Sequence, residues 1–431
     1  MFGHNEIAPH LMQAIVVIPL ALFLMSTFRR HGFSVPASIV PVVGLTVWFL
    51  AVGHAQLGLI ELTAGVMIFA AIALIINDDE RRSRDALAGL IIGIVMVAKV
   101  ILGVLCIGVI LAAIGFHQRR RIIRILVSAS IPVSALVIWA ANSGVLVELL
   151  RTTFVTAPAI AKGPGLHTLT LANHIFRTSV GTWGPFVPLA VVGLRRNSDR
   201  MLHVWRRVGI AWLIVGVGVV IPQRWNFYQA DLFAPAIWIL ATVGLENLLV
   251  SRRATSAMSI ADPGFGVRRI GVRLARLLGC FTLVLSLLPL ALGARKVVRL
   301  SRHEFGITSK ARRGKYLADS VAYRRISLMA LPFSAEPRTP ISLLGDPLIY
   351  FVRDFEPAIA LTGFLPQQWT PDLWAWWTRE LQDVRPAEVF VDNESLITLR
   401  KSTKSYDSFT ALYRQAPKDG LNDFGVWWVL K

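Results

Sequence analysis

Apolar runs long enough to cross a bilayer recur through the first 294 residues, and they constrain the fold more than any other feature. They cover roughly residues 10–28, 36–54, 58–77, 86–116, 122–141, 182–194, 208–222, 229–250 and 274–294. A helix needs about 20 apolar residues to span hydrocarbon, because its backbone polar groups must all be satisfied within the segment. Only 16% of the residues are charged, too few for an ordinary soluble protein. The pattern predicts a polytopic α-helical membrane protein.

Clusters of arginine occur at every second connection between these runs. They hold 20 of the 25 Lys and Arg residues before Arg295. The clusters are Arg29 and Arg30; Arg81, Arg82 and Arg84; Arg119, Arg120, Arg121 and Arg124; Arg195, Arg196, Arg200, Arg206 and Arg207; and Arg252, Arg253, Arg268, Arg269, Arg273 and Arg276. Because cytoplasmic loops retain Lys and Arg, the clusters predict orientation. They explain the net charge of +19 without a nucleic-acid partner.

The alternation requires residues 86–116 to form a hairpin of two short helices, Ala86–Ala98 and Val100–Phe116, that turns at Lys99. The chain then has about ten membrane segments, and both its N-terminus and its C-terminal part lie outside. Arginine far exceeds lysine, as is typical of a GC-rich bacterial genome, so we expect the plasma (inner) membrane of a bacterial cell envelope.

The apolar runs stop after Leu292 and a different kind of chain begins. We expect residues 1–296 to form the transmembrane domain and residues 297–431 an extracytoplasmic soluble α/β domain. Strands are predicted at Ile341–Gly345, Glu388–Asp392 and Trp427–Leu430, and helices at Pro371–Val384 and Tyr406–Gln415. The tryptophans have two interpretations, as core or interface anchors and as a sugar-stacking platform. They are Trp369, Trp374, Trp376 and Trp377.

Ionisable residues at membrane depth cost about 2.5–3.5 kcal/mol on insertion scales and are usually retained for sites or pathways. Lys99, at the predicted turn, fits a cation that holds an anionic group such as a lipid phosphate, and equally a snorkelling amine. Glu61 lies near the outer start of the third run. It fits a general base or a hydrogen-bond partner of a substrate, and equally an interfacial carboxylate.

Further polar candidates lie in the other exterior connections. Arg224 and Asp231 flank an aromatic segment that contains Tyr228. As an ion pair they fasten helix ends, whereas a guanidinium there also fits bidentate binding of a phosphate. Gln56, Tyr228 and Asp231 are candidates for substrate binding. The connection at 142–181 is 40 residues long, and loops of more than about 15 residues are commonly functional, so it is a candidate lid or acceptor loop.

The cysteines and histidines give little indication of a metal site. Cys106 and Cys280 both lie in apolar runs, without disulfide or ligand spacing. His167 and His174 are a weak pair, and solvated or core histidines are more typical of such spacing. A divalent metal stays open as a cofactor. The P-loop, HExxH, CxxC and GxSxG motifs are absent from the sequence.

Five segments carry a resemblance to one family of membrane enzymes. They are Ala88–Lys99 with Gly89 and Gly93; Gln223–Gly244 with its Arg, aromatic residues and Pro235; Gly53–Glu61; Leu344–Tyr350; and Arg385–Val391. With the short-loop helices and the exterior α/β domain, they resemble the GT-C superfamily of polyprenyl-phosphate-sugar-dependent glycosyltransferases, of the aminoarabinose and mannosyl transferase kind. The similarity covers nearly the whole chain, and each motif alone is weak.

The resemblance implies an inverting transfer of a sugar from a polyprenyl-phosphate donor to an extracytoplasmic lipid, glycan or protein acceptor. Lys99 and Arg224 are then expected to contact the phosphate, with Glu61 and Asp231 as polar lining. The chain departs from the family at its start, because the first helix and the first exterior loop, which carries the catalytic carboxylate, are not found there. The catalytic base is therefore unknown, with Glu6 and Glu61 as weak candidates.

A different class of function also stays open. The chain could be a truncated, non-catalytic GT-C-like membrane partner, or a transporter or flippase in which the same charges line a passage. Transporters often carry internal repeats, and the sequence shows no convincing two-fold repeat. A cavity open to the outer leaflet favours the transferase, and a site that is reachable from both faces favours the transporter.

Overall fold

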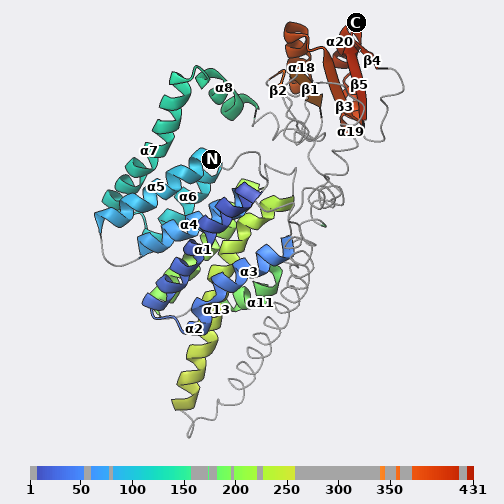
Figure 1. Ribbon diagram of the computed structural model, residues 1–431. Helices are drawn as coiled ribbons and strands as arrows, with labels where there is room; N and C mark the ends of the chain where they lie inside the picture. The colour runs from blue at the N-terminus through green and yellow to red at the C-terminus, as the bar shows by residue number, and fades with distance from the viewer. Residues whose placement is uncertain are drawn as a thin grey trace, which may run out of the picture. The chain divides into compact units, whose positions relative to one another are not determined.

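The computed structural model describes residues 7–52, 60–76, 81–156, 173, 182–195, 199–220, 227–257, 340–344, 356–359, 371–416 and 425–431. Its contacts divide the chain into two units. The helical unit comprises residues 1–149 and 168–299, and the second unit comprises residues 150–167 and 300–431. The predicted span at 274–294 lies outside the described residues. Figure 1 shows the helices of the first unit and the small sheet of the second.

Most of the described helices fall where the apolar runs predict them, whereas the helical segments Leu146–Arg151 and Thr152–Thr156 lie in the predicted long connection. The described helices are α1 (Ile7–Arg30), α2 (Val35–Ser38), α3 (Val40–Val52), α4 (Ile60–Ile76), α5 (Arg82–Ala98), α6 (Leu102–Ile114), α7 (Arg119–Asn142), α8 (Leu146–Arg151), η2 (Thr152–Thr156), η3 (Gly184–Phe186), α11 (Val187–Gly193), α12 (Arg200–Val220), η5 (Phe227–Phe233) and α13 (Ala234–Ala257). Three segments, Arg119–Asn142, Arg200–Val220 and Ala230–Val250, are long and apolar enough to cross a membrane. The chain is therefore a mostly helical membrane protein, and the number of ten segments stays a prediction.

The predicted hairpin is confirmed. Helix α5 ends at Ala98 and α6 begins at Leu102, with the turn at Lys99 between them. The helices have 17 and 13 residues, or about 25 and 20 Å at 1.5 Å per residue. Each is shorter than the roughly 30 Å hydrocarbon core, as expected for a hairpin made from a single apolar run.

Starts and ends of successive helices meet at one end of the helical unit. Arg206 Nη1, near the start of α12, donates to the carbonyl oxygen of Leu194, which follows α11, at 3.2 Å. Arg207 Nη2 donates to the Ala113 carbonyl near the end of α6, also at 3.2 Å. The described arginines of the clusters gather here: Arg29 and Arg30; Arg81, Arg82 and Arg84; Arg119, Arg120, Arg121 and Arg124; and Arg195, Arg200, Arg206 and Arg207. We call this the arginine end, and the helices alternate in direction relative to it, as the clusters predict.

Helices α5 and α7 run parallel in close backbone contact. A Cβ built on Gly89 would collide with the Ile125 carbonyl oxygen, and one built on Gly93 would collide with that of Ala129. Both glycines and the residues that they face are separated by the same number of positions in the sequence, as in two parallel helices. Two glycines four residues apart therefore line one interface. This small-xxx-small pattern lets membrane helices approach closely. The Gly89 and Gly93 pattern, quoted above for a family resemblance, therefore has a packing role in this chain.

Two other glycines allow a second close crossing. Gly193 of α11 faces the Leu240 carbonyl of α13, and Gly244 of α13 faces the Leu189 carbonyl of α11. The residue number rises along α11 as it falls along α13, so these two helices are antiparallel. A short helix, α11, is thus held against the largely buried helix α13.

Replacing Gly93 with alanine should destabilise the helical unit, because the new Cβ meets the backbone of α7. Gly218 of α12 is the matched control, since no atom lies within 4 Å of its ideal Cβ. At Gly218, alanine should be neutral or stabilising by up to about 1 kcal/mol through helix propensity. Thermal unfolding of the purified variants in detergent measures both effects. Equal melting temperatures for Gly93→Ala and Gly218→Ala would contradict the contact.

The second unit contains a five-stranded sheet in the order β2-β1-β3-β5-β4. Its elements are β1 (Pro340–Leu344), β2 (Glu356–Pro357), α18 (Pro371–Val384), β3 (Glu388–Asp392), α19 (Asn393–Lys401), α20 (Thr403–Leu412), β4 (Tyr413–Gln415) and β5 (Gly425–Leu430). Strand β1 pairs in parallel with β2 and β3, whereas β5 pairs antiparallel with β3 and β4. The three predicted strands and the helix Pro371–Val384 are confirmed.

The predicted helix Tyr406–Gln415 is wrong at its C-terminal end. Helix α20 stops at Leu412, and the next three residues form β4 against β5. The Tyr413 side chain is buried, and its hydroxyl donates to the Pro386 carbonyl at 3.0 Å. Strand pairing here satisfies the backbone while it buries the ring, so tertiary contacts override the helical pattern. Helix α19, which the sequence pattern did not predict, begins where the Asp392 carboxylate accepts the Ser395 N–H at 2.6 Å.

Two of the four candidate tryptophans belong to the core of the second unit. Trp374 and Trp377 of α18 are buried, and the Trp377 ring centroid lies 5.3 Å from that of Phe409 on α20. The core interpretation is confirmed for this pair. Trp376 is half-buried, and the Arg151 guanidinium lies 4.0 Å from its ring centroid, within the second unit. Trp369 lies outside the described residues.

Replacing Glu388 with glutamine should stabilise the second unit at alkaline pH. Its Oε2 is buried without a hydrogen-bond partner among the described residues, and burial raises the pKa of the carboxyl group. The folded state therefore holds this proton more tightly than the unfolded state, and stability is lost as pH rises through the raised pKa. Pulse proteolysis in urea should show a benefit of Glu388→Gln at pH 8 that shrinks towards pH 4. Asp407→Asn, at an exposed carboxylate of α20, should show no such trend.

Candidate functional site

Three of the sequence-predicted site residues lie at the end of the helical unit opposite the arginine end. Lys99 follows the last residue of α5, and Glu61 is in the first turn of α4. Asp231 lies in η5, which precedes α13 and packs against α4 and α12. We call this the distal end. Lys99, Glu61 and Asp231 thus lie at the same end of the helical unit, on three different elements.

The structure describes the remaining candidates only in part or not at all. Tyr228 lies on the backbone of η5 beside Asp231, and nothing is described of its side chain. Glu6, Gln56 and Arg224 lie outside the described residues, as do His167, His174 and most of the long connection. The predicted Arg224–Asp231 relation therefore stays a prediction.

Asp231 is the buried carboxylate of the distal end, with 1% of its surface exposed. Its neighbours in the chain, Ala230 and Leu232, are equally buried. The Trp212 indole of α12 donates to the Leu232 carbonyl at 3.0 Å and fixes η5 against the bundle. An ionisable group at membrane depth is costly, so a buried acid is usually retained for a structural contact, a site or a pathway.

No group of three or more His, Cys, Asp or Glu side chains able to hold a metal occurs among the described residues. Of the sequence-predicted candidates described at the distal end, Glu61 and Asp231 carry carboxyl groups, and the half-buried Lys99 carries an amine. Carboxylates can take a proton from a hydroxyl group, and an ammonium group can hold a phosphate as a point charge. The described part of this end supports acid–base and phosphate-binding chemistry.

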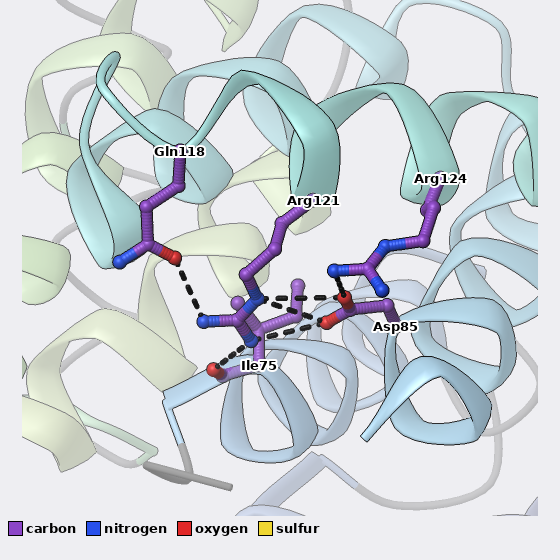
Figure 2. A network of polar contacts seen from close by, with 5 residues as sticks. All are labelled: Ile75, Asp85, Gln118, Arg121 and Arg124. Atoms are coloured by element: carbon purple, nitrogen blue, oxygen red, sulfur yellow. Dashed lines mark hydrogen bonds and ion pairs between the residues drawn. The ribbon is translucent and has the colours of Figure 1, made fainter. Parts of the chain in front are cut away.

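The arginine end contains a buried network that the sequence reasoning did not find (Figure 2). Arg121 of α7 donates from Nη2 and Nε to Asp85 Oδ1 of α5 at 3.0 and 3.2 Å. Arg124 Nη2 lies 3.1 Å from Asp85 Oδ2. The remaining donors of Arg121 reach Gln118 Oε1 at 2.9 Å and the Ile75 carbonyl at 2.7 Å. Three helices, α4, α5 and α7, are thereby joined at one point.

The network continues the glycine interface of α5 and α7. Asp85 precedes Gly89 by one turn, and Arg121 precedes Ile125 by one turn, so the ion pair has the same offset as the glycine contacts. The arginines were interpreted only as topology markers. The signal that could have found the pair was Asp85 itself, an acid on the same helical face as Gly89 and Gly93.

A second buried acid, Glu246, connects α13 with the start of α2 at the same end. Glu246 of α13 is 6% exposed, and its Oε2 accepts the backbone N–H and the hydroxyl group of Ser34 at 2.7 and 2.6 Å. Ser34 is the N-cap of α2, so the carboxylate also lies at the positive end of that helix dipole. Both buried acids of the arginine end are thus bound to other helices and serve structure rather than catalysis.

Asp85→Leu should destabilise the helical unit by about 3–5 kcal/mol, because it leaves the buried Arg121 without its carboxylate. The double variant Asp85→Leu, Arg121→Met should recover most of this loss, since neither charge is then left alone. Thermal unfolding in detergent gives both values, and Glu148→Gln at an exposed acid of α8 should match the wild type. If the double variant loses as much stability as the two single variants together, the Asp85–Arg121 pair does not act as a unit.

No protein-family model, curated protein or solved structure matches the chain. The functional argument therefore depends on the sequence pattern and on the geometry described above. Two features carry it: the segregation of the arginines to one end, and the placement of Lys99, Glu61 and Asp231 at the other.

Proposed function

We propose that this protein is an integral membrane glycosyltransferase that moves a sugar from a polyprenyl-phosphate donor to a lipid, glycan or protein acceptor outside the cytoplasm. The observation that carries the proposal is the grouping of Lys99, Glu61 and Asp231 at the distal end, away from the arginines. Because Lys and Arg are retained on the cytoplasmic side, the distal end is the exterior end. The membrane is the plasma (inner) membrane.

The proposed reaction uses each of these groups once. The acceptor hydroxyl oxygen attacks the anomeric carbon, the bond from that carbon to the donor phosphate oxygen breaks, and polyprenyl phosphate leaves. A carboxylate takes the hydroxyl proton, for which Glu61 is the first candidate of the described residues and Asp231 lines the site. Lys99 stabilises the charge that develops on the departing phosphate, together with Arg224.

Two structural features fit this chemistry. Lys99 lies in a turn between two short helices, where its amine can reach the headgroup region of the bilayer. Asp231 lies on a short helical segment that the Trp212 indole fixes. The polyprenyl chain of the donor stays in the bilayer.

Lys99→Ala and Glu61→Ala should each reduce sugar transfer, Lys99→Ala by weakening phosphate stabilisation and Glu61→Ala by removing the proton acceptor. Loss of a general base typically lowers the catalytic rate about 10²–10⁴-fold. The measurement is turnover of radiolabelled polyprenyl-phosphate sugar by the full chain in lipid nanodiscs. Arg30→Gln, at an exposed residue of the arginine end, is the control and should keep wild-type turnover. Undiminished turnover in both alanine variants would reject these sites but not the class of enzyme.

The class depends on orientation, which cysteine labelling in intact cells tests. Ser143→Cys lies at the distal end of α7, and His117→Cys lies just before its start at the arginine end; both positions are exposed. An impermeant maleimide should label position 143 from outside and position 117 only after lysis. The reverse pattern would place the distal end in the cytoplasm and reject the transferase. Correct orientation with a folded chain but no turnover on any donor would instead favour a non-catalytic partner or transporter.

A further inference from the structure

The starts of α5 and α7 lie side by side at the arginine end, and among the described residues there positive charge exceeds negative charge. One carboxylate, Asp85, faces two guanidinium groups, Arg121 and Arg124 (Figure 2). Arg121 is buried, whereas the Arg124 side chain is 30% exposed. Arg124 Nε has no hydrogen-bond acceptor among the described residues. The network therefore keeps a surplus cation at the surface of the bundle.

Three further features strengthen the positive field at this corner. Both helices begin here, so the positive ends of two macrodipoles point in the same direction. No acidic side chain lies in the first turn of α7. Arg120 is exposed and precedes Arg124 by one turn on the same face of α7. Anions are favoured where helix starts and guanidinium groups combine.

The face of α7 that follows these arginines is apolar and uncovered. Arg120, Arg124, Val127 and Ile131 recur at spacings of three and four, so they form one stripe along the helix. Val127 is 60% exposed and Ile131 is 57% exposed. A pair of cations is thus followed, along a single helix face, by surface that suits hydrocarbon. Free phosphate would use only the first part of this stripe, whereas a lipid uses all of it.

We propose that this corner binds an anionic phospholipid of the surrounding leaflet. Arg120 and Arg124 hold the phosphate of the headgroup, and an acyl chain lies along Val127 and Ile131. The starts of α5 and α7 add their dipoles, and Asp85 holds Arg124 in place without neutralising it fully. The site is separate from the distal end, and it does not depend on the proposed transferase activity.

Native mass spectrometry of the full chain, titrated with phosphatidylglycerol in a neutral detergent, tests the site. Each basic residue near an anionic surface is worth about a fivefold change in affinity. Arg120→Gln should therefore weaken binding of the tightest lipid about fivefold, and Arg120→Gln with Arg124→Gln about 25-fold. The single variant leaves the Asp85 network intact, so its loss of binding is not a loss of folding. Thermal unfolding without added lipid checks this.

The matched control removes the same charge elsewhere at the arginine end. Arg30→Gln with Arg195→Gln changes two exposed arginines of other clusters and should leave the tightest lipid in place. Equal weakening in both double variants would show only diffuse attraction and overturn the proposal. Phosphatidylcholine should bind more weakly than phosphatidylglycerol, and equal binding would also overturn it. Glycerol phosphate should not displace the lipid, and displacement at equal concentration would identify a soluble-anion site instead.

Discussion

The close approach of α5 to α7 is the contact on which the charged end of the helical unit depends. Gly89 and Gly93 allow the two backbones to approach closely, and at this separation Asp85 reaches both Arg121 and Arg124. Apolar side chains gain little by leaving lipid for one another, so backbone proximity and polar contacts have to supply the specificity of membrane helix packing. The glycines set the distance, and the ion pair fixes the register.

Separation of charge between the two ends of the bundle connects the fold with the proposed function. At the arginine end the buried acids Asp85 and Glu246 are bound by neighbouring helices. At the distal end Lys99 lies in a turn, Glu61 in the first turn of α4 and Asp231 in the short segment η5. The buried acids with described helix-to-helix contacts and the candidate site residues are therefore found in different parts of the chain, as the proposed function expects.

Sequence patterns predicted the helices because runs of apolar residues have one stable solution in a bilayer. The same reasoning found the α5–α6 hairpin from the length of the apolar run and the alternation of the arginine clusters. It missed the Asp85 network, since the partner of a buried acid depends on which helices become neighbours, and hydropathy does not encode this. It also extended α20 into Tyr413, where pairing with β5 decides the conformation. For the candidate site, the pattern placed Lys99, Glu61 and Asp231 at a common end, whereas their mutual distances depend on packing.

The arginines of this chain have two different structural roles, one for buried side chains and one for exposed side chains. Arg121 donates hydrogen bonds to Asp85, Gln118 and the Ile75 carbonyl. It therefore stabilises the fold and contributes little to the electrostatic field outside the protein. Arg120, one residue earlier, is exposed and free to meet a headgroup. Because neighbouring residues on a helix point about 100° apart, a single cluster can serve both purposes. Orientation then follows from the exposed members, and stability from the buried ones.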